Sequence, residues 1–190
     1  FTYPAGRIRI PNDSKSRAGG VLYSDYSLGR FFAEAARQPW FENTIFLVTA
    51  DHCASSAGRT EIPLQKYHIP ALILAPGLIE PGVVDGIVSQ IDLMPTLLSL
   101  LNMSYDSHFY GRSIFDPAYV NRAFIATYQD LGYLEGDTFT ILSPVRRFEQ
   151  YRVVPTEENP HHLEAMERKD AVQVDRAIGY YQTSCKWNKR

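Results

Sequence analysis

A short run of apolar residues, Ile45 to Val48, constrains the fold more than any other feature of the sequence. The run has no polar alternation, which is typical of a parallel strand that is covered on both faces. Sheets of this kind bind ligands just beyond the carboxyl ends of their strands. Asp51 and His52 follow almost directly, so the sequence places a carboxylate and an imidazole where chemistry is expected.

Asp51 and His52 supply one hard oxygen donor and one borderline nitrogen donor, a pair suited to Mn²⁺ or Zn²⁺. Two ligands do not complete a site of four or more, so the remaining ligands must come from elsewhere. A structural interpretation competes with this one, in which Asp51 caps the next turn and His52 is a hydrogen-bonded loop residue. The dipeptide taken alone favours the structural interpretation, because short motifs often match by chance.

The first two-thirds of the chain alternates between helix and strand. Residues 20–37 carry apolar side chains at helical spacing and predict an amphipathic helix. Strands are expected near 44–50 and 69–75, with a polar loop between them. A second helix is predicted over 92–101, with Asp92 as its N-cap and its leucines in the core. The sequence therefore predicts an α/β fold with a mostly parallel sheet flanked by helices.

After about residue 120 the pattern changes to short β-prone runs that are separated by glycine and proline. The runs are Ala123 to Tyr128, Thr138 to Leu142 and Tyr151 to Val154, and they predict a small antiparallel meander. The segment from His161 to about Lys186 is polar with spaced apolar residues, which predicts a terminal helix.

We expect one domain over residues 1–190, made of an α/β part (1–120) and a part with antiparallel strands and the helix (121–190). A chain of 190 residues with 45% hydrophobic residues can bury a sizeable core. Its net charge of −2 argues against a nucleic-acid partner. No apolar stretch approaches the roughly 20 residues that span a bilayer.

Several short motifs occur in a fixed order along the first 145 residues or so. They are Tyr23-Ser24-Asp25-Tyr26, Trp40-Phe41-Glu42-Asn43-Thr44-Ile45-Phe46, Thr49-Ala50-Asp51-His52, Tyr67-His68-Ile69-Pro70, Ala75-Pro76-Gly77 and Ser89-Gln90-Ile91-Asp92-Leu93-Met94-Pro95-Thr96. Together they resemble the C-terminal part of the sulfatase-like catalytic domain. More narrowly, they are similar to the lipoteichoic-acid-synthase and phosphoglycerol-transferase branch of the alkaline phosphatase superfamily.

The resemblance implies an enzyme, a metal-dependent transferase or hydrolase that acts on phosphate or sulfate esters, such as phospholipid headgroups, envelope glycolipids or glycans. Asp51 and His52 match the family's metal-ligand pair, with Mn²⁺ or Zn²⁺ as the expected ion and Mg²⁺ or Ca²⁺ as alternatives. The family places its Thr or Ser nucleophile and a further acidic ligand in the N-terminal half of the domain, and neither has a recognisable counterpart here. We therefore expect a C-terminal piece, inactive by itself, whose partner is the N-terminal half of the same protein.

In the implied mechanism, the metal-activated hydroxyl of the nucleophile attacks the phosphoryl group in line and forms a covalent phospho-enzyme. A second alcohol or water then resolves this intermediate. A glycan or glycerol-phosphate acceptor would make the protein a builder of an envelope polymer. Water as the acceptor would make it a phosphatase or sulfatase.

Three further residues could bind the substrate. His68 precedes the strand that is expected beside the Asp-His strand, so it could face the same cleft. Arg59 and Lys66 lie in the loop after the motif and could neutralise a phosphate or sulfate group. The competing interpretations are a structural histidine and two solvated loop cations. The neighbouring pair His161-His162 is expected to face solvent.

Cys53 and Cys185 leave three states open: a disulfide, two free thiols, or a Cys53 thiolate beside the metal ion. Members of the family are typically membrane-anchored, with the catalytic domain outside the cytoplasmic membrane. The resemblance thus implies a periplasmic or cell-surface domain.

Two other classes of function compete with this one. A non-catalytic module that completes a fold or binds a ligand in a larger membrane protein is supported by the missing nucleophile. A hydrolase with a Ser-His-Asp triad is disfavoured because the sequence has no Gly-x-Ser-x-Gly motif.

Overall fold

A computed structural model describes residues 2–52 and 62–187 of the chain. They form two compact units: Phe1–Val48 with Leu72–Gly82, and Thr49–Ala71 with Val83–Arg190. Short 3-10 helices occur at Asn12–Ser14, Phe41–Asn43, Leu64–Tyr67 (η3) and Gln90–Asp92 (η4). Within the described residues, none of the helices has both the length and the apolar character to cross a membrane.

The first unit contains the helix α1 (Arg17–Ala35), which confirms the helix predicted over 20–37. Ser16 caps its start, because the hydroxyl accepts the N–H of Gly19 at 3.1 Å. Phe31 and Phe32 meet the ring of Phe46 with their edges, at centroid distances of 5.9 and 5.3 Å. The apolar face predicted for this helix therefore packs on the strand that leads to the Asp-His motif.

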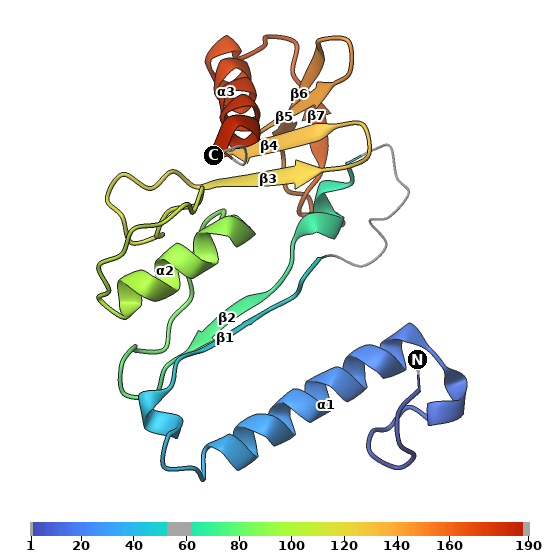
Figure 1. The fold of residues 1–190 in the computed structure, drawn as a ribbon. Helices are drawn as coiled ribbons and strands as arrows, with labels where there is room; N and C mark the ends of the chain where they lie inside the picture. The colour runs from blue at the N-terminus through green and yellow to red at the C-terminus, as the bar shows by residue number, and fades with distance from the viewer. Residues whose placement is uncertain (1, 53–61, 188–190) are drawn as a thin grey trace. The chain divides into compact units, whose positions relative to one another are not determined.

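The strands β1 (Phe46–Thr49) and β2 (Ala71–Leu74) form a two-stranded sheet and lie side by side (Figure 1). Ala50, just after β1, donates its N–H to the carbonyl of Pro70, just before β2, at 3.4 Å. The end of β1 thus lies beside the start of β2, and the two strands run in opposite directions. The sequence predicted both strands, but it predicted that the first one is parallel to its partner. An unbroken apolar run indicates that a strand is buried, but it does not indicate the direction of the neighbouring strand.

The second unit contains a five-stranded antiparallel sheet in sequence order. Its strands are β3 (Arg122–Ala126), β4 (Leu131–Glu135), β5 (Thr138–Ser143), β6 (Arg147–Val153) and β7 (Leu163–Ala165). The predicted meander is confirmed, with two strands more than the sequence indicated. β4 contains a glycine and β7 has only three residues, and both features weaken the sequence pattern of a strand.

The terminal helix α3 (Ala171–Trp187) packs on β4 and β5, and it begins ten residues later than predicted. The segment 163–165 pairs with β6 instead of extending the helix. Asp170 then caps the helix, because its carboxylate accepts the N–H of Gln173 at 3.1 Å. The hydroxyl of Tyr181 lies 3.0 and 2.7 Å from the carbonyl oxygens of Ile125 and Gly132, which ties α3 to the sheet.

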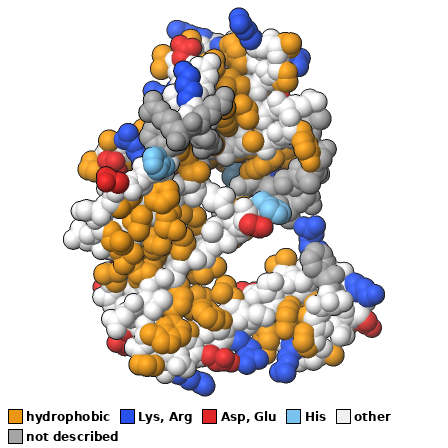
Figure 2. Space-filling model, in the orientation of Figure 1, with side chains coloured by type: hydrophobic (Ala, Val, Ile, Leu, Met, Phe, Trp, Pro, Cys, Tyr) orange, Lys and Arg blue, Asp and Glu red, His pale blue; other side chains and the backbone are white. Residues whose placement is uncertain are grey.

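The helix α2 (Leu93–Leu100) confirms the helix predicted over 92–101. Its most buried residues are Pro95 and Thr96, whereas Leu101, which was predicted to lie in the core, is 46% exposed. Apolar side chains reach the surface around this helix (Figure 2), and Ile91 and Met94 are 41% and 43% exposed.

Candidate active site

Asp51 and His52 lie in the turn that follows β1, with their side chains 87% and 73% exposed. Asp51 Oδ2 is 3.4 Å from His52 Nε2, and Asp51 Oδ1 accepts the backbone N–H of His52 at 2.9 Å. The turn therefore presents a carboxylate oxygen and an imidazole nitrogen side by side, and both are open to solvent.

The distance between these two atoms fits a shared metal ion. Two ligand atoms that each lie about 2.1 Å from a tetrahedral zinc ion are roughly 3.4 Å apart. In the described parts of the chain, 2–52 and 62–187, no three His, Cys, Asp or Glu side chains converge as a metal site. A metal ion held by Asp51 and His52 would therefore need additional ligands from outside these residues.

Gln90 reaches the same turn from η4, although no role was predicted for it from the sequence. Its Nε2 lies 3.0 Å from the carbonyl oxygen of Ala50 and 3.3 Å from that of Asp51. The only sequence signal was the motif Ser89-Gln90-Ile91-Asp92, which does not reveal a contact some 40 residues away.

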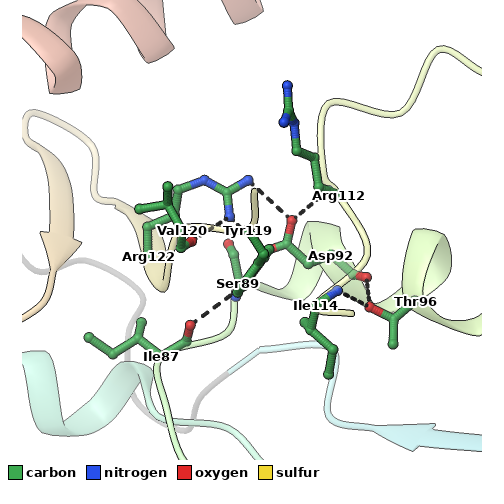
Figure 3. Close-up of polar contacts among 9 residues, drawn as sticks. All are labelled: Ile87, Ser89, Asp92, Thr96, Arg112, Ile114, Tyr119, Val120 and Arg122. Carbon is green, nitrogen blue, oxygen red and sulfur yellow. Dashed lines mark hydrogen bonds and ion pairs between the residues drawn. The ribbon is translucent and has the colours of Figure 1, made fainter. Parts of the chain in front are cut away.

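Asp92 is fully buried, and four residues donate hydrogen bonds to its carboxylate (Figure 3). It accepts the backbone N–H of Ser89 at 3.3 Å and of Arg112 at 2.9 Å. The Tyr119 hydroxyl donates at 3.0 Å, and the Arg122 guanidinium donates at 2.9 and 3.2 Å. Asp92 was predicted to cap the second helix, but its side chain makes no cap bond to α2. Instead, it forms a capping box with Ser89 at the start of η4.

Arg122 is almost as deeply buried as its partner, with 3% of its side chain exposed. Burial alone would lower the pKa of its guanidinium, but hydrogen bonds and attraction to Asp92 hold the pKa above its ordinary value. The rings of Tyr119, Phe124 and Tyr180 surround it at 5.3 to 5.6 Å. Burial and the charge of Asp92 also raise the pKa of Tyr119, so its hydroxyl stays protonated and can donate.

A glycine allows the loop after α2 to lie against η4. A Cβ atom at Gly111 would clash with the carbonyl oxygen of Ile91 and would come within 2.9 Å of a carboxylate oxygen of Asp92. Thr96 adds a further tie, because its hydroxyl donates to the Asp92 carbonyl at 2.7 Å and accepts the N–H of Ile114 at 3.1 Å. The turn that carries Gln90 is therefore fixed by buried contacts.

The sulfatase family model matches residues 6–103, just over half of the 190-residue chain. The chain belongs to the sulfatase family. The matched region contains the Asp-His turn together with Gln90 and Asp92.

Two relatives of this sulfatase-family chain agree with that assignment. An arylsulfatase of Clostridium perfringens (strain 13 / Type A) is 30% identical over 107 residues, which are 52% of this chain and 22% of the arylsulfatase. A crystal structure of a protein in the alkaline phosphatase superfamily from Vibrio parahaemolyticus matches with a TM-score of 0.87 and 31% identity. That match covers 98% of this chain and 46% of the Vibrio chain. The predicted α/β class and the wider superfamily are thus confirmed, and the chain spans less than half the length of either relative.

Two of the other predicted site residues of the sulfatase-family chain are described. His68 is the first residue after η3 and lies two residues before Pro70. Pro70 in turn accepts the N–H of Ala50, next to the Asp-His turn. Lys66 is half-buried in η3. Arg59 and Cys53 lie outside the described residues. The roles of His68, Lys66 and Arg59 in substrate binding stay predictions.

His68 has a neighbour that the sequence did not predict. Its ring meets the ring of His161 edge-on, with centroids 5.5 Å apart and planes at 82°. Burial, and then the charge of His68, lowers the pKa of His161. His161 was expected to face solvent together with His162; instead it is half-buried, and only His162 is exposed.

Proposed function

We propose that this sulfatase-family protein is a metal-dependent hydrolase or transferase of sulfate or phosphate esters, with Asp51 and His52 as metal ligands. The observation that carries the proposal is the 3.4 Å separation of Asp51 Oδ2 and His52 Nε2 in an exposed turn at the end of β1. The donor set suits Mn²⁺ or Zn²⁺, with Mg²⁺ or Ca²⁺ as alternatives. The arylsulfatase relative supports sulfate esters as one substrate class.

A bound divalent ion would supply Lewis-acid chemistry at an ester oxygen and would help to ionise a hydroxyl nucleophile. The residues of this chain would bind the ion, hold the turn in place and contact the substrate. Asp51 and His52 hold the ion, and Gln90 holds the backbone that carries them. His68, Lys66 and Arg59 are proposed to contact the sulfate or phosphate group.

The remaining parts of the site are proposed to lie in the rest of the full-length protein, because the chain covers only 46% of the Vibrio protein. These parts are a Thr or Ser nucleophile and a further acidic ligand. The exposed apolar side chains around α2, including Ile91 and Met94, support a packing partner from that region.

The narrower form of the proposal is a phosphoglycerol-type transferase that acts on a phospholipid headgroup, outside the cytoplasmic membrane. Its support is the resemblance of the ordered motifs, taken together, to that branch of the superfamily. Full-length protein should then transfer glycerol phosphate to a glycan or glycerol-phosphate acceptor. A sulfatase or phosphodiesterase should instead release its product to water.

The test compares full-length wild type with Asp51→Ala and His52→Ala, using 4-nitrophenyl sulfate and bis(4-nitrophenyl) phosphate as substrates. We expect each variant to lose bound metal and to lose at least about 100-fold in kcat/KM, because metal ligands matter more than their supporting residues. Chelation should abolish wild-type turnover, and Mn²⁺ or Zn²⁺ should restore it.

Asp137→Ala is a matched control, because Asp137 is an exposed carboxylate that pairs with Arg152. Unchanged metal content and turnover in both Asp51→Ala and His52→Ala would contradict the proposal that these residues hold a catalytic ion. No turnover of either ester by the wild type would favour a non-catalytic module. A preference for one of the two esters would assign the substrate class.

A further inference from the structure

The carbonyl group of Ala50 lies opposite a residue that cannot donate a backbone hydrogen bond. Ala50 donates its own N–H to the Pro70 carbonyl at 3.4 Å. In an antiparallel hydrogen-bonded pair, the facing residue returns an N–H to the first carbonyl. Proline has no N–H, so Pro70 cannot donate a hydrogen bond to the Ala50 carbonyl. This carbonyl directly precedes the Asp-His turn.

The Gln90 carboxamide supplies a donor at this position. Its Nε2 lies 3.0 Å from the Ala50 oxygen and 3.3 Å from the Asp51 oxygen, and its two hydrogens can serve both acceptors. The Thr49 hydroxyl is also near the Ala50 oxygen, at 3.2 Å. It has a single hydrogen, however, and it lies closer to the Pro70 oxygen, at 3.1 Å. Among these side chains, only Gln90 can bond both carbonyls at once.

The backbone around Gln90 is anchored on both sides. Ser89 and Asp92 close a capping box across the turn, and Asp92 is fully buried against Arg122. A shift of η4 would break the contacts of a buried charged pair, which is costly. The backbone that carries Gln90 is therefore tied to the interior of the unit, while Gln90 itself and the turn that it contacts are exposed.

We propose that Gln90 is a positioning residue, which replaces the missing donor of Pro70 and thereby holds the Asp51-His52 turn in place for metal binding. The Asp92–Arg122 pair sets the position of Gln90 from the interior. The part of this inference that concerns the metal ion rests on the proposed function, whereas the part that concerns the order of the turn does not.

The test uses two variants of the full-length protein. Gln90→Ala removes the side-chain amide, and Gln90→Glu keeps its length but replaces the NH₂ donor by an oxygen. In metal-free protein we expect both variants to speed up amide hydrogen exchange in peptides that cover residues 49–52. The dissociation constants for Zn²⁺ and Mn²⁺, measured by competition with a chelator, should rise about 10- to 100-fold, as is typical for residues that orient metal ligands.

Gln182→Ala, at an exposed position on α3, is the matched control and should match wild type in both measurements. Circular dichroism checks that each variant is folded, and Gln90→Glu serves as the readout if Gln90→Ala does not fold. Wild-type exchange and wild-type metal affinity in a folded Gln90 variant would overturn the inference.

Failure of this inference can be told apart from failure of the proposed function. If Asp51→Ala leaves metal affinity unchanged but the Gln90 variants speed up exchange, the metal proposal fails and the role of Gln90 in ordering the turn stands. If Asp51→Ala loses the metal ion but the Gln90 variants match wild type, the positioning role fails and the metal proposal stands.

Discussion

At the scale of single residues, two aspartates have opposite surroundings. Asp51 is 87% exposed beside His52, so its oxygen is available to a metal ion. Asp92 is fully buried, and its carboxylate oxygens are occupied by donors from four other residues. The first is the proposed metal ligand, whereas the second ties η4 to the residues around it.

Replacement of Arg122 by Met should destabilise the protein by about 3–5 kcal/mol, because it leaves the buried Asp92 charge without its partner. Urea unfolding measures this loss. Arg152→Ala is the control: Arg152 pairs with Asp137 at 2.5 Å, but both side chains are more than half exposed, so its loss should cost at most about 1 kcal/mol. Equal losses in the two variants would contradict the assignment.

His161 should make stability depend on pH. Its pKa is lowered in the folded protein by burial and by His68, so the unfolded chain takes up the proton more readily. The contribution of neutral His161 to the free energy of unfolding is fully present above the pKa that it has in the unfolded chain, about 6.5. This contribution is lost as the pH falls below that value. We expect the Tm of His161→Gln to fall less than that of wild type between about pH 7 and pH 5.5. If wild type and His161→Gln lose the same number of degrees across this range, the burial of His161 beside His68 has no such effect.

At the scale of elements, Gly132 explains both the packing of β4 and the failure to predict this strand. A Cβ atom at Gly132 would approach the Phe139 ring of β5 to 2.8 Å and the Ile62 side chain to 3.2 Å. Phe139 is fully buried and belongs to the main apolar cluster of this unit. Gly132 therefore weakens the strand pattern in the sequence, but it also leaves the space that the Phe139 ring occupies.

Gly132→Ala should therefore destabilise the protein by about 1–3 kcal/mol, which is the usual cost of overpacking a core. Gly179→Ala is the matched control, because a Cβ atom at this position of α3 meets nothing within 4 Å. It should stabilise the helix by up to about 1 kcal/mol, since alanine favours a helix over glycine. Chemical unfolding of both variants tests the pair, and the same sign of change in the two would count against the packing described here.

At the scale of the whole molecule, the described residues divide into two units, and the larger one contains the buried apolar cluster to which Phe139 belongs. β5 lies in the middle of the five-stranded sheet and is also covered by α3. Its Phe139 and Thr140 are fully buried. The most stable part of this unit is thus expected at β5.

Hydrogen exchange should be slowest in peptides that cover residues 138–143, because exchange there needs the most extensive opening. Peptides over β7, a three-residue strand at the edge of the sheet, should exchange much faster. Mass spectrometry of the exchanging protein measures both regions in one experiment. Slower exchange in β7 than in β5 would contradict this order.

The sequence by itself determined the features that depend on near neighbours. Helical spacing located α1 and α2, and apolar runs located β1 and β2. The ordered motifs indicated the sulfatase family and placed Asp51 and His52 at the end of a strand. Each of these features is encoded within a few adjacent residues.

Only the tertiary structure decided the contacts that support the site. Asp92 and Arg122 are 30 residues apart, Gln90 and Ala50 are 40 apart, and the rings of His68 and His161 come from separate parts of the second unit. The direction of β2 beside β1, which sets Pro70 opposite Ala50, was also invisible in the sequence. The physical reason is that local periodicity reports which side of an element is buried, whereas the partners of a side chain depend on which distant segments the fold brings together.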